Sequence, residues 1–262
     1  MRLPIYQVDA FTDRLFGGNP AAVVPLTEWL PDATMQAIAA ENNLSETAFF
    51  VPEGEGYALR WFTPALEVDL CGHATLASAY VIGLFLAPEK RRLSFRTVKA
   101  GTLVVTREGD ELGMDFPAWP ASAADMPAGL GDTLGGTPAY YLKGKRDGVA
   151  VFTTAADVAA LRPDFAALKQ LFPFAVIATA PGNDGVDFVS RFFAPGAGID
   201  EDPVTGSAHC TLIPYWAERL GKTRLHARQI SPRIGELSCT SRGDRVTIGG
   251  RATLYLEGTI TI

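Results

Sequence analysis

The chain has 262 residues, of which 47% are hydrophobic and 20% are charged, and its formal net charge is −6. This composition is typical of a folded globular protein with one large domain or two ordinary ones, and it excludes a disordered or fibrous chain. The acidic balance also argues against a nucleic-acid-binding protein, because such proteins carry a basic surface.

The cysteines and the absence of long apolar segments indicate where the protein resides. Cys71, Cys210 and Cys239 are odd in number and widely spaced, which favours reduced thiols over disulfides. The first residues, 1–11, resemble a strand and lack the apolar run of a signal peptide. No apolar segment reaches the ~18 residues that a membrane span needs. We therefore expect a soluble, cytoplasmic protein with neither a membrane nor a nucleic acid as partner.

Strand-like runs dominate the first half of the chain, and one amphipathic helix interrupts them. Residues 32–43 predict a helix with Asp32 as N-cap and an apolar stripe of Met35, Ile38 and Ala39. The runs rich in β-branched and aromatic residues predict strands at residues 4–11, 21–26, 47–52, 58–64, 92–97, 101–108 and 111–116.

The second half follows a segment rich in Pro, Gly and Ala, residues 116–132, which is the best linker candidate. Short helices are expected at 157–163 and 164–172. Strands are expected at residues 139–144, 148–154, 174–180, 187–193, 224–230, 233–241, 245–250 and 253–262.

Two further segments, residues 74–86 and 208–220, are apolar on nearly every face. A helix of that kind is buried, and at this length it is too short to cross a bilayer. Pro214 should kink the second helix or end its first part. Because strands strongly outnumber helices, we expect each buried helix to lie inside its own curled sheet, and a simple alternating parallel sheet is excluded.

The two halves also repeat one another. The sequence RWFTP at 60–64 is echoed by RFFAP at 191–195, and each is followed by an acidic loop, a Gly turn at 71–74 or 205–208, and an apolar segment. Chance is the weaker explanation for a matching order of this length. The repeat predicts two similar domains related by a pseudo-twofold axis, with boundaries at residues 1–118 and 119–262, the last strand being able to pack on the first domain.

Each Gly turn opens a buried helix whose first backbone amides have no helical partner. Such helix starts bind anions, and small residues such as Gly72, Gly206 and Ser207 let a ligand approach the backbone closely. The alternative is plain capping, in which Ser207 and Asp202 only satisfy those amides. For the duplicated pair we favour a cleft between the domains that holds a small carboxylate.

Six motifs together carry a family resemblance: QVDAF, FGGNPAAVV, NLSETAFF, RWFTP, LCGHATLASA and EDPVTGSAH. In this order they resemble the phenazine-biosynthesis isomerases, the PhzF-like proteins, which are similar to diaminopimelate epimerase in fold. The resemblance implies an α+β fold of two pseudo-symmetric domains, each a curved mixed or antiparallel sheet around a central helix. It also implies an active site between the domains, and it suggests a homodimer.

The epimerase relatives place a catalytic cysteine before the Gly of each copy. Here the first such position holds Cys71 but the second holds Thr205, which excludes a racemase that uses two thiols. We expect Cys71 to be an inert packing thiol, with His73 pointing away from it.

The resemblance assigns the proton chemistry to Glu46. A carboxylate that enters an apolar strand should have a raised pKa, which suits proton exchange near neutral pH. Without the resemblance, the alternative interpretation is that Glu46 is an exposed residue at the start of a strand. The resemblance also implies that His73 and Asp202 flank the substrate and that Gly72, Gly206 and Ser207 hold its carboxylate, whereas Asp200 and Glu201 are expected to be solvated.

The leading hypothesis is therefore a cofactor-independent isomerase that uses no metal. It would move a proton within a small carboxylic acid of the dihydro-hydroxyanthranilate type. The alternatives are a non-catalytic binder of anionic metabolites and an epimerase or racemase of another amino acid. A metal hydrolase using His73, His209, Asp202 and Cys71 lacks any paired ligand spacing, and His209 and His226 are best explained as packing or surface residues.

Overall fold

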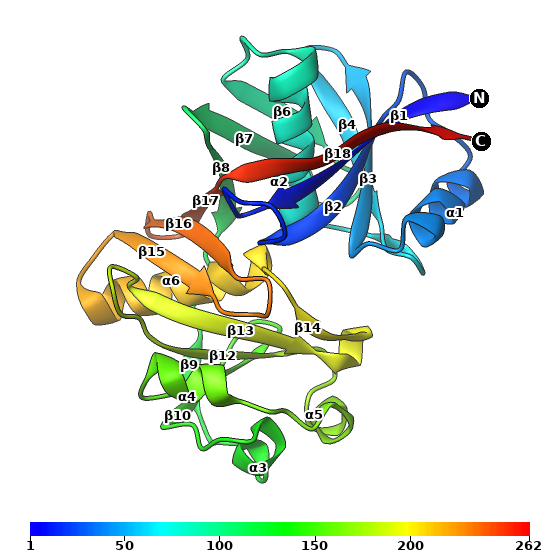
Figure 1. The fold of residues 1–262 in the computed structure, drawn as a ribbon. Helices are drawn as coiled ribbons and strands as arrows, with labels where there is room; N and C mark the ends of the chain where they lie inside the picture. The colour runs from blue at the N-terminus through cyan, green and yellow to red at the C-terminus, as the bar shows by residue number, and fades with distance from the viewer. The chain divides into compact units, whose positions relative to one another are not determined.

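The computed structural model describes all 262 residues, which form two compact units (Figure 1). Unit 1 comprises Met1–Asp115 and Gly249–Ile262, and unit 2 comprises Phe116–Ile248. No helix in either unit has both the length and the apolar character that crossing a membrane requires. All three cysteines are free and buried.

Unit 1 is a mixed sheet that has the two ends of the chain side by side at one of its ends. The antiparallel partners β1 (Arg2–Ala10) and β18 (Ala252–Thr261) run side by side, which places the termini together (Figure 1). The pairings give the strand order β18-β1-β2-β3-β4-β6-β7-β8, in which β2–β3 and β4–β6 are parallel. The remaining bounds are β2 (Asn19–Pro25), β3 (Glu46–Glu53), β4 (Gly56–Phe62), β6 (Arg92–Arg96), β7 (Thr102–Glu108) and β8 (Glu111–Pro117), with the short β5 (Glu67–Val68) on β4.

The two helices of unit 1 lie on different sides of this sheet. Helix α2 (Gly72–Val81) contacts β1, β2, β3 and β18 and is buried almost all round, as its apolar sequence predicts; a π-helical turn, Ile82–Leu86, extends it. Helix α1 (Asp32–Asn42) packs against β3 and β4 through Met35 and Ile38. The expectation that Asp32 is the N-cap of α1 is wrong. Pro31 holds that position, and Asp32 pairs with Arg60 at 2.8 Å.

Unit 2 repeats the same pairing scheme. Its order is β9-β10-β11-β12-β13-β15-β16, with β14 on β13, and β11–β12 and β13–β15 are the parallel pairs. The match of parallel and antiparallel steps to unit 1 confirms the duplication. The strands are β9 (Ser122–Ala124), β10 (Tyr140–Lys143), β11 (Gly148–Val151), β12 (Val176–Pro181), β13 (Phe188–Ala194), β14 (Ile199–Asp202), β15 (Arg224–Gln229), β16 (Gly235–Ser241) and β17 (Arg245–Gly250).

Helix α6 (Gly206–Leu220) is the counterpart of α2, and it is continuous through Pro214. Of the two expectations for Pro214, a kink or the end of the helix's first part, the second is wrong because the helix continues to Leu220. Proline supplies no N–H to the carbonyl of Cys210 four residues earlier, but that carbonyl accepts a hydrogen bond from the Trp119 amide at 2.9 Å. The shorter helices α3 (Leu130–Leu134), α4 (Ala155–Ala160) and α5 (Phe165–Leu171) complete the unit, and α4 packs on β12 and β13.

The echoed arginines have the same structural role in the two units. Arg60 forms a two-bond ion pair with Glu67 at 2.7 Å, and Arg191 forms one with Glu201 at 2.8 Å. In both cases the guanidinium also lies over the phenylalanine two residues later. The expectation that Glu201 is a solvated loop charge is therefore wrong. Asp200 is exposed, as expected from the sequence.

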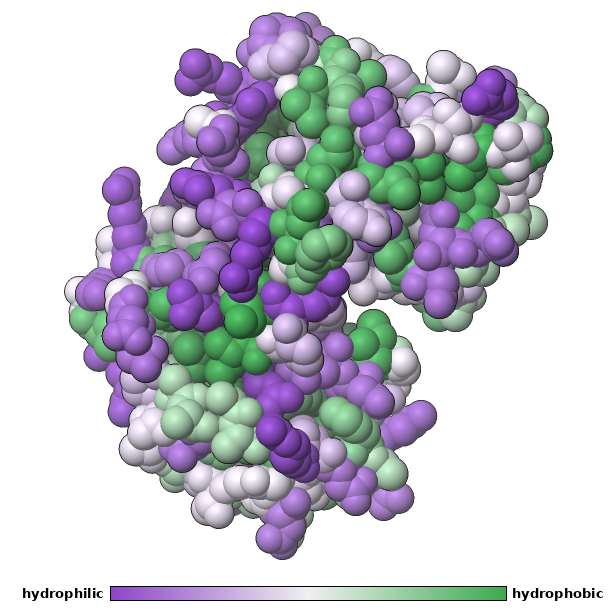
Figure 2. Space-filling model, in the orientation of Figure 1, coloured by the Kyte–Doolittle hydropathy of each residue, from purple (hydrophilic) through white to green (hydrophobic).

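Apolar side chains also reach the surface. Phe16 and Tyr255 are 68% and 47% exposed, and their rings meet edge to face. Figure 2 shows hydrophobic side chains between hydrophilic ones on the face in view. Exposure of this scattered kind is ordinary for a folded protein.

Candidate active site

Glu46 is the first residue of β3 and lies in the interior of unit 1. Asn43 adopts a left-handed conformation (φ 48°) that ends α1, and the chain then enters β3, where Glu46 lies opposite Ala21 of the parallel strand β2. Asn42 donates a hydrogen bond to the Thr47 hydroxyl at 3.0 Å, which ties the end of α1 to the start of β3. The Glu46 side chain is 13% exposed, so it is not the exposed strand-start Glu of the alternative interpretation.

The start of α2 brings two further side chains to Glu46. His73 Nε2 lies 3.1 Å from Glu46 Oε2, and His73 Nδ1 lies 3.4 Å from the Sγ of Cys71, the N-cap residue of α2. The imidazole therefore contacts a carboxylate and a thiol, and the three groups form one compact cluster. The expectation that His73 points away from Cys71 is wrong, because the first turn of the helix folds both side chains toward β3.

Burial and charge act in opposite directions on this cluster. Burial alone raises the pKa of Glu46, but the charge of His73 and hydrogen bonds from His73 and Cys71 outweigh it and leave the pKa below its ordinary value. The raised pKa expected from the apolar strand is therefore not found. Burial lowers the pKa of His73, yet its neighbours Cys71 and Glu46 hold that pKa well above the ordinary value.

The thiol takes no negative charge near neutral pH. Burial, together with the charge of Glu46, raises the pKa of Cys71 to about 11. Glu46 is therefore the anion that stabilises the protonated His73. The resulting state is a buried carboxylate–imidazolium pair with a neutral thiol next to both groups.

The same three residues form the one grouping of possible metal ligands in the structure. A ligand atom from each of Glu46, Cys71 and His73 lies within 4.8 Å of the others, and carboxylate, thiolate and imidazole are donors that zinc accepts. Both ring nitrogens of His73 already face a partner. Asp202 and His209, the other residues of the hydrolase hypothesis, are not members of this grouping.

In unit 2 the start of α6 is held by a network around Thr205. The Thr205 hydroxyl donates to the Asp202 carboxylate, and the Gln229 side chain accepts from the Thr205 amide at 2.9 Å and donates to the Asp202 carbonyl at 2.8 Å. Asp202 is therefore fixed beside the helix start. Gln229 is a positioning residue that the sequence pattern did not single out.

Ser207, the second residue of α6, has a cationic neighbour that sequence reasoning also missed. Arg146 Nη2 donates to the Ser207 hydroxyl at 2.8 Å, and its guanidinium lies 4.1 Å from the ring centroid of Phe174. Arg146 belongs to the loop between β10 and β11. The only signal available for it was the short basic run Lys143–Arg146.

The capping alternative does not describe these helix starts. No side chain forms a capping hydrogen bond at the start of α2 or of α6. The second-turn residues instead bind the carbonyl of the N-cap residue: Thr75 donates to the Cys71 carbonyl at 2.6 Å, and His209 Nδ1 lies 2.8 Å from the Thr205 carbonyl. Gly72 and Gly206 are thus the first residues of two helices whose leading amides are not capped by side chains.

Comparisons with known proteins cover the whole chain. The family model described as "Phenazine biosynthesis-like protein" matches residues 8–258. An uncharacterised isomerase of Pseudomonas aeruginosa is 54% identical over 99% of both chains, and a human phenazine biosynthesis-like domain-containing protein is 40% identical over all of both chains. A crystal structure of a PhzF-family phenazine biosynthesis protein from Enterococcus faecalis matches with a TM-score of 0.97 and 48% identity over all of both chains.

Proposed function

Because the chain belongs to the PhzF family of phenazine biosynthesis-like isomerases, we propose that it moves a proton within a small carboxylic acid and that Glu46 carries the proton. One observation carries this proposal: the buried Glu46 carboxylate lies 3.1 Å from an imidazole whose pKa is raised well above its ordinary value. A paired base and acid of this kind are what proton transfer at carbon requires.

The lowered pKa of Glu46 is compatible with a shuttle. The carboxylate is ionised before the substrate arrives, so it can accept a proton from a substrate carbon. Once protonated, Glu46 no longer neutralises His73, and it is therefore a strong enough acid to return the proton to another carbon. His73 keeps its place beside Glu46 throughout, and its positive charge stabilises the charged form of the carboxyl.

The helix start of unit 2 is proposed as a binding site for the substrate's carboxylate. Its amides at Gly206 and Ser207 have no side-chain cap, and Arg146, which pairs with Asp147 at 3.1 Å, donates a hydrogen bond to the Ser207 hydroxyl. Asp202 is fixed next to these amides and would flank the substrate. Gly72, at the start of α2, offers the equivalent amide in unit 1. The substrate class that we propose from the family resemblance is a dihydro-hydroxyanthranilate or a related unsaturated or amino-bearing acid, with no cofactor.

Binding at this helix start is tested with anthranilate, a carboxylate that lacks the dihydro ring. Arg146→Gln should weaken anthranilate binding by about tenfold or more, because a hydrogen bond to a charged group contributes about 1.5–3 kcal/mol. Lys145→Gln, the neighbouring cation that lies over Trp119, is the matched control and should bind normally. Equal affinities in the two variants, measured by calorimetry, would remove Arg146 from the site.

A thiol nucleophile is the second candidate, because Cys71, His73 and Glu46 stand in the order of a nucleophile, a base and an orienting acid. The protonation state of the Cys71 thiol argues against this mechanism. Its pKa of about 11 leaves almost no thiolate at neutral pH, whereas catalytic cysteines have lowered pKa values. We therefore favour the carboxylate.

The deciding experiment compares wild type with Glu46→Gln, which keeps size and hydrogen bonding but cannot exchange a proton. A dihydro-hydroxyanthranilate is incubated in D₂O, and NMR follows both isomerisation and deuterium uptake. Loss of the shuttle should lower the rate by ~10²–10⁴-fold while anthranilate binding is kept. Glu53→Gln, on the same strand but paired with Arg96 at the surface, is the control and should be fully active.

Each other result points to a different conclusion. A Glu46→Gln variant that turns over at the wild-type rate excludes Glu46 as the shuttle. A folded variant that no longer binds would make Glu46 a recognition residue and favour the non-catalytic binder.

A homodimer in the cytoplasm is proposed from the same family, and light scattering of the purified protein tests the assembly.

A further inference from the structure

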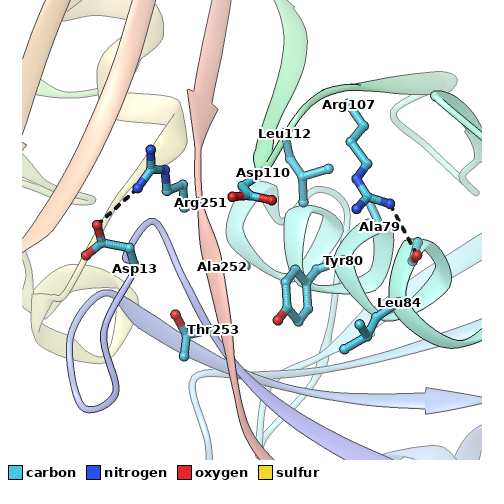
Figure 3. A pocket seen from close by; sticks show the side chains of 11 residues that line it. Asp13, Ala79, Tyr80, Leu84, Arg107, Asp110, Leu112, Arg251, Ala252 and Thr253 are labelled. Atoms are coloured by element: carbon cyan, nitrogen blue, oxygen red, sulfur yellow. Dashed lines mark hydrogen bonds and ion pairs between the residues drawn. The ribbon is translucent and has the colours of Figure 1, made fainter. Parts of the chain in front are cut away.

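A pocket of about 240 Å³ lies in unit 1 away from Glu46, at the place where the curled sheet does not close (Figure 3). The strands at the two ends of the sheet order both line it: Ala252 and Thr253 come from β18, and Leu112 comes from β8. Its floor is the C-terminal half of α2 and the π-helical turn, where Ala79 and Gly83 leave room. None of the site residues discussed above lines this pocket.

One cation on the wall of the pocket is rigidly held. Arg107 donates from Nη1 to the Gly83 carbonyl at 3.2 Å and from Nε to the Gly109 carbonyl at 3.1 Å. The Gly83 carbonyl is available because the π-helical pattern would pair it with residue 88, and Pro88 has no N–H. A Cβ at Gly83 would lie 3.2 Å from Nη1, so a side chain there would push the guanidinium away by a few tenths of an ångström.

This arrangement leaves the rest of the guanidinium available. Nη2 of Arg107 has no hydrogen bond in the structure, and the two carbonyls fix the plane in which it lies. A pre-oriented guanidinium loses little freedom on binding a carboxylate.

The pocket also carries a free negative charge. Asp110, in the turn between β7 and β8, is exposed and forms no ion pair, and Figure 3 shows it with Leu112 between it and Arg107 in this view. The other two charged residues of the lining, Asp13 and Arg251, neutralise each other at 3.2 Å. One unneutralised cation and one unneutralised anion therefore face the same small volume.

We propose that this pocket is a second binding site and that its ligand is an α-amino acid with an apolar side chain. The carboxylate would bind Arg107, the ammonium would bind Asp110, and the side chain would lie on Leu84 and Leu112. A phosphate or a dicarboxylate fits less well, because Asp110 would repel a second negative charge. A simple amine would leave Arg107 without its partner.

Calorimetric titration with L-leucine and two truncated analogues tests the proposal. Leucine should bind with a dissociation constant of about 1 mM or below, which is within reach of a ligand of this size. Isoamylamine lacks the carboxylate and 4-methylpentanoate lacks the ammonium, so each should bind at least about tenfold more weakly.

Variants locate the binding. Asp110→Asn and Arg107→Lys should each weaken leucine binding by about tenfold, whereas Glu108→Gln and Arg92→Lys, which alter nearby groups outside the lining, should not. Arg146→Gln, at the helix start of unit 2, should also leave leucine binding unchanged. Absence of binding up to about 20 mM, equal affinity for the analogues, or loss of binding only in Arg146→Gln would each overturn the proposal.

Discussion

At the scale of single residues, the pair formed by Glu46 and His73 shows that burial alone does not set a pKa. Burial would neutralise both groups if each were alone, but opposite charges 3.1 Å apart in a poorly solvated site stabilise one another. The pair is therefore charged in the resting protein. Cys71 completes the cluster as a neutral hydrogen-bonding neighbour.

The role of Cys71 can be separated from that of Glu46 by a pH profile. Cys71→Ala removes a hydrogen bond that lowers the pKa of Glu46, so that pKa should rise. Because Glu46 must be ionised to accept a proton, the acidic limb of the rate profile should move to higher pH, with the maximal rate within about tenfold of wild type. Cys210→Ala, another buried thiol, should leave the limb in place; complete inactivation of Cys71→Ala alone would favour the thiol mechanism.

At the scale of elements, α2 and α6 are built alike but carry different chemistry. Each starts with glycine, and each has a second-turn side chain on the carbonyl of the N-cap residue, Thr75 in α2 and His209 in α6. His209 is fully buried, and its Nε2 has no hydrogen-bond partner. It is the packing residue that the sequence predicted, and it makes α6 sensitive to acid.

Burial lowers the pKa of His209 to about 4, below the ~6.5 of an unfolded chain. Between these values the unfolded state binds a proton that the folded state does not, so the free energy of unfolding decreases as the pH falls. The loss should reach about 3 kcal/mol by pH ~4. Urea unfolding of His209→Gln should show a smaller loss, since glutamine can still donate to the Thr205 carbonyl, whereas the exposed His226→Gln should follow wild type.

At the scale of the whole molecule, the duplication can be tested on equivalent residues of the two units. Arg191 and Glu201 are 10% and 14% exposed, and Arg191 also donates to two backbone carbonyls, of Val158 and Leu161. Glu67, the partner of Arg60, is 34% exposed. The same ion pair is therefore more deeply buried in unit 2.

Removing the arginine should cost more in unit 2. Arg191→Gln leaves a buried carboxylate without its partner and should lower the free energy of unfolding by about 3 kcal/mol. Arg60→Gln leaves two better solvated carboxylates, Glu67 and Asp32, and should cost about 1 kcal/mol. The double variant Arg191→Gln, Glu201→Gln should recover part of the loss; equal costs in the two units, by urea unfolding, would contradict this account.

The sequence by itself determined the features that depend on local pattern. Apolar residues on every face predicted that the helices after Gly72 and Gly206 are buried, because such a helix is stable only inside a core. The ordered motifs predicted the duplicated fold and the family. The echo of RWFTP in RFFAP predicted that the two halves share one plan, because equivalent positions in a duplicated sheet meet equivalent neighbours.

The tertiary structure alone decided which side chains meet across elements. His73 contacts both Cys71 and Glu46 because the start of α2 turns its side chain toward β3. Arg146 contacts Ser207, and Glu201 pairs with Arg191, although the partners belong to different segments of the chain. Charge state follows from such contacts, which is why the pKa of Glu46 could not be predicted from its apolar strand. Burial raises that pKa, and only the 3.1 Å distance between His73 and Glu46 explains why charge outweighs burial.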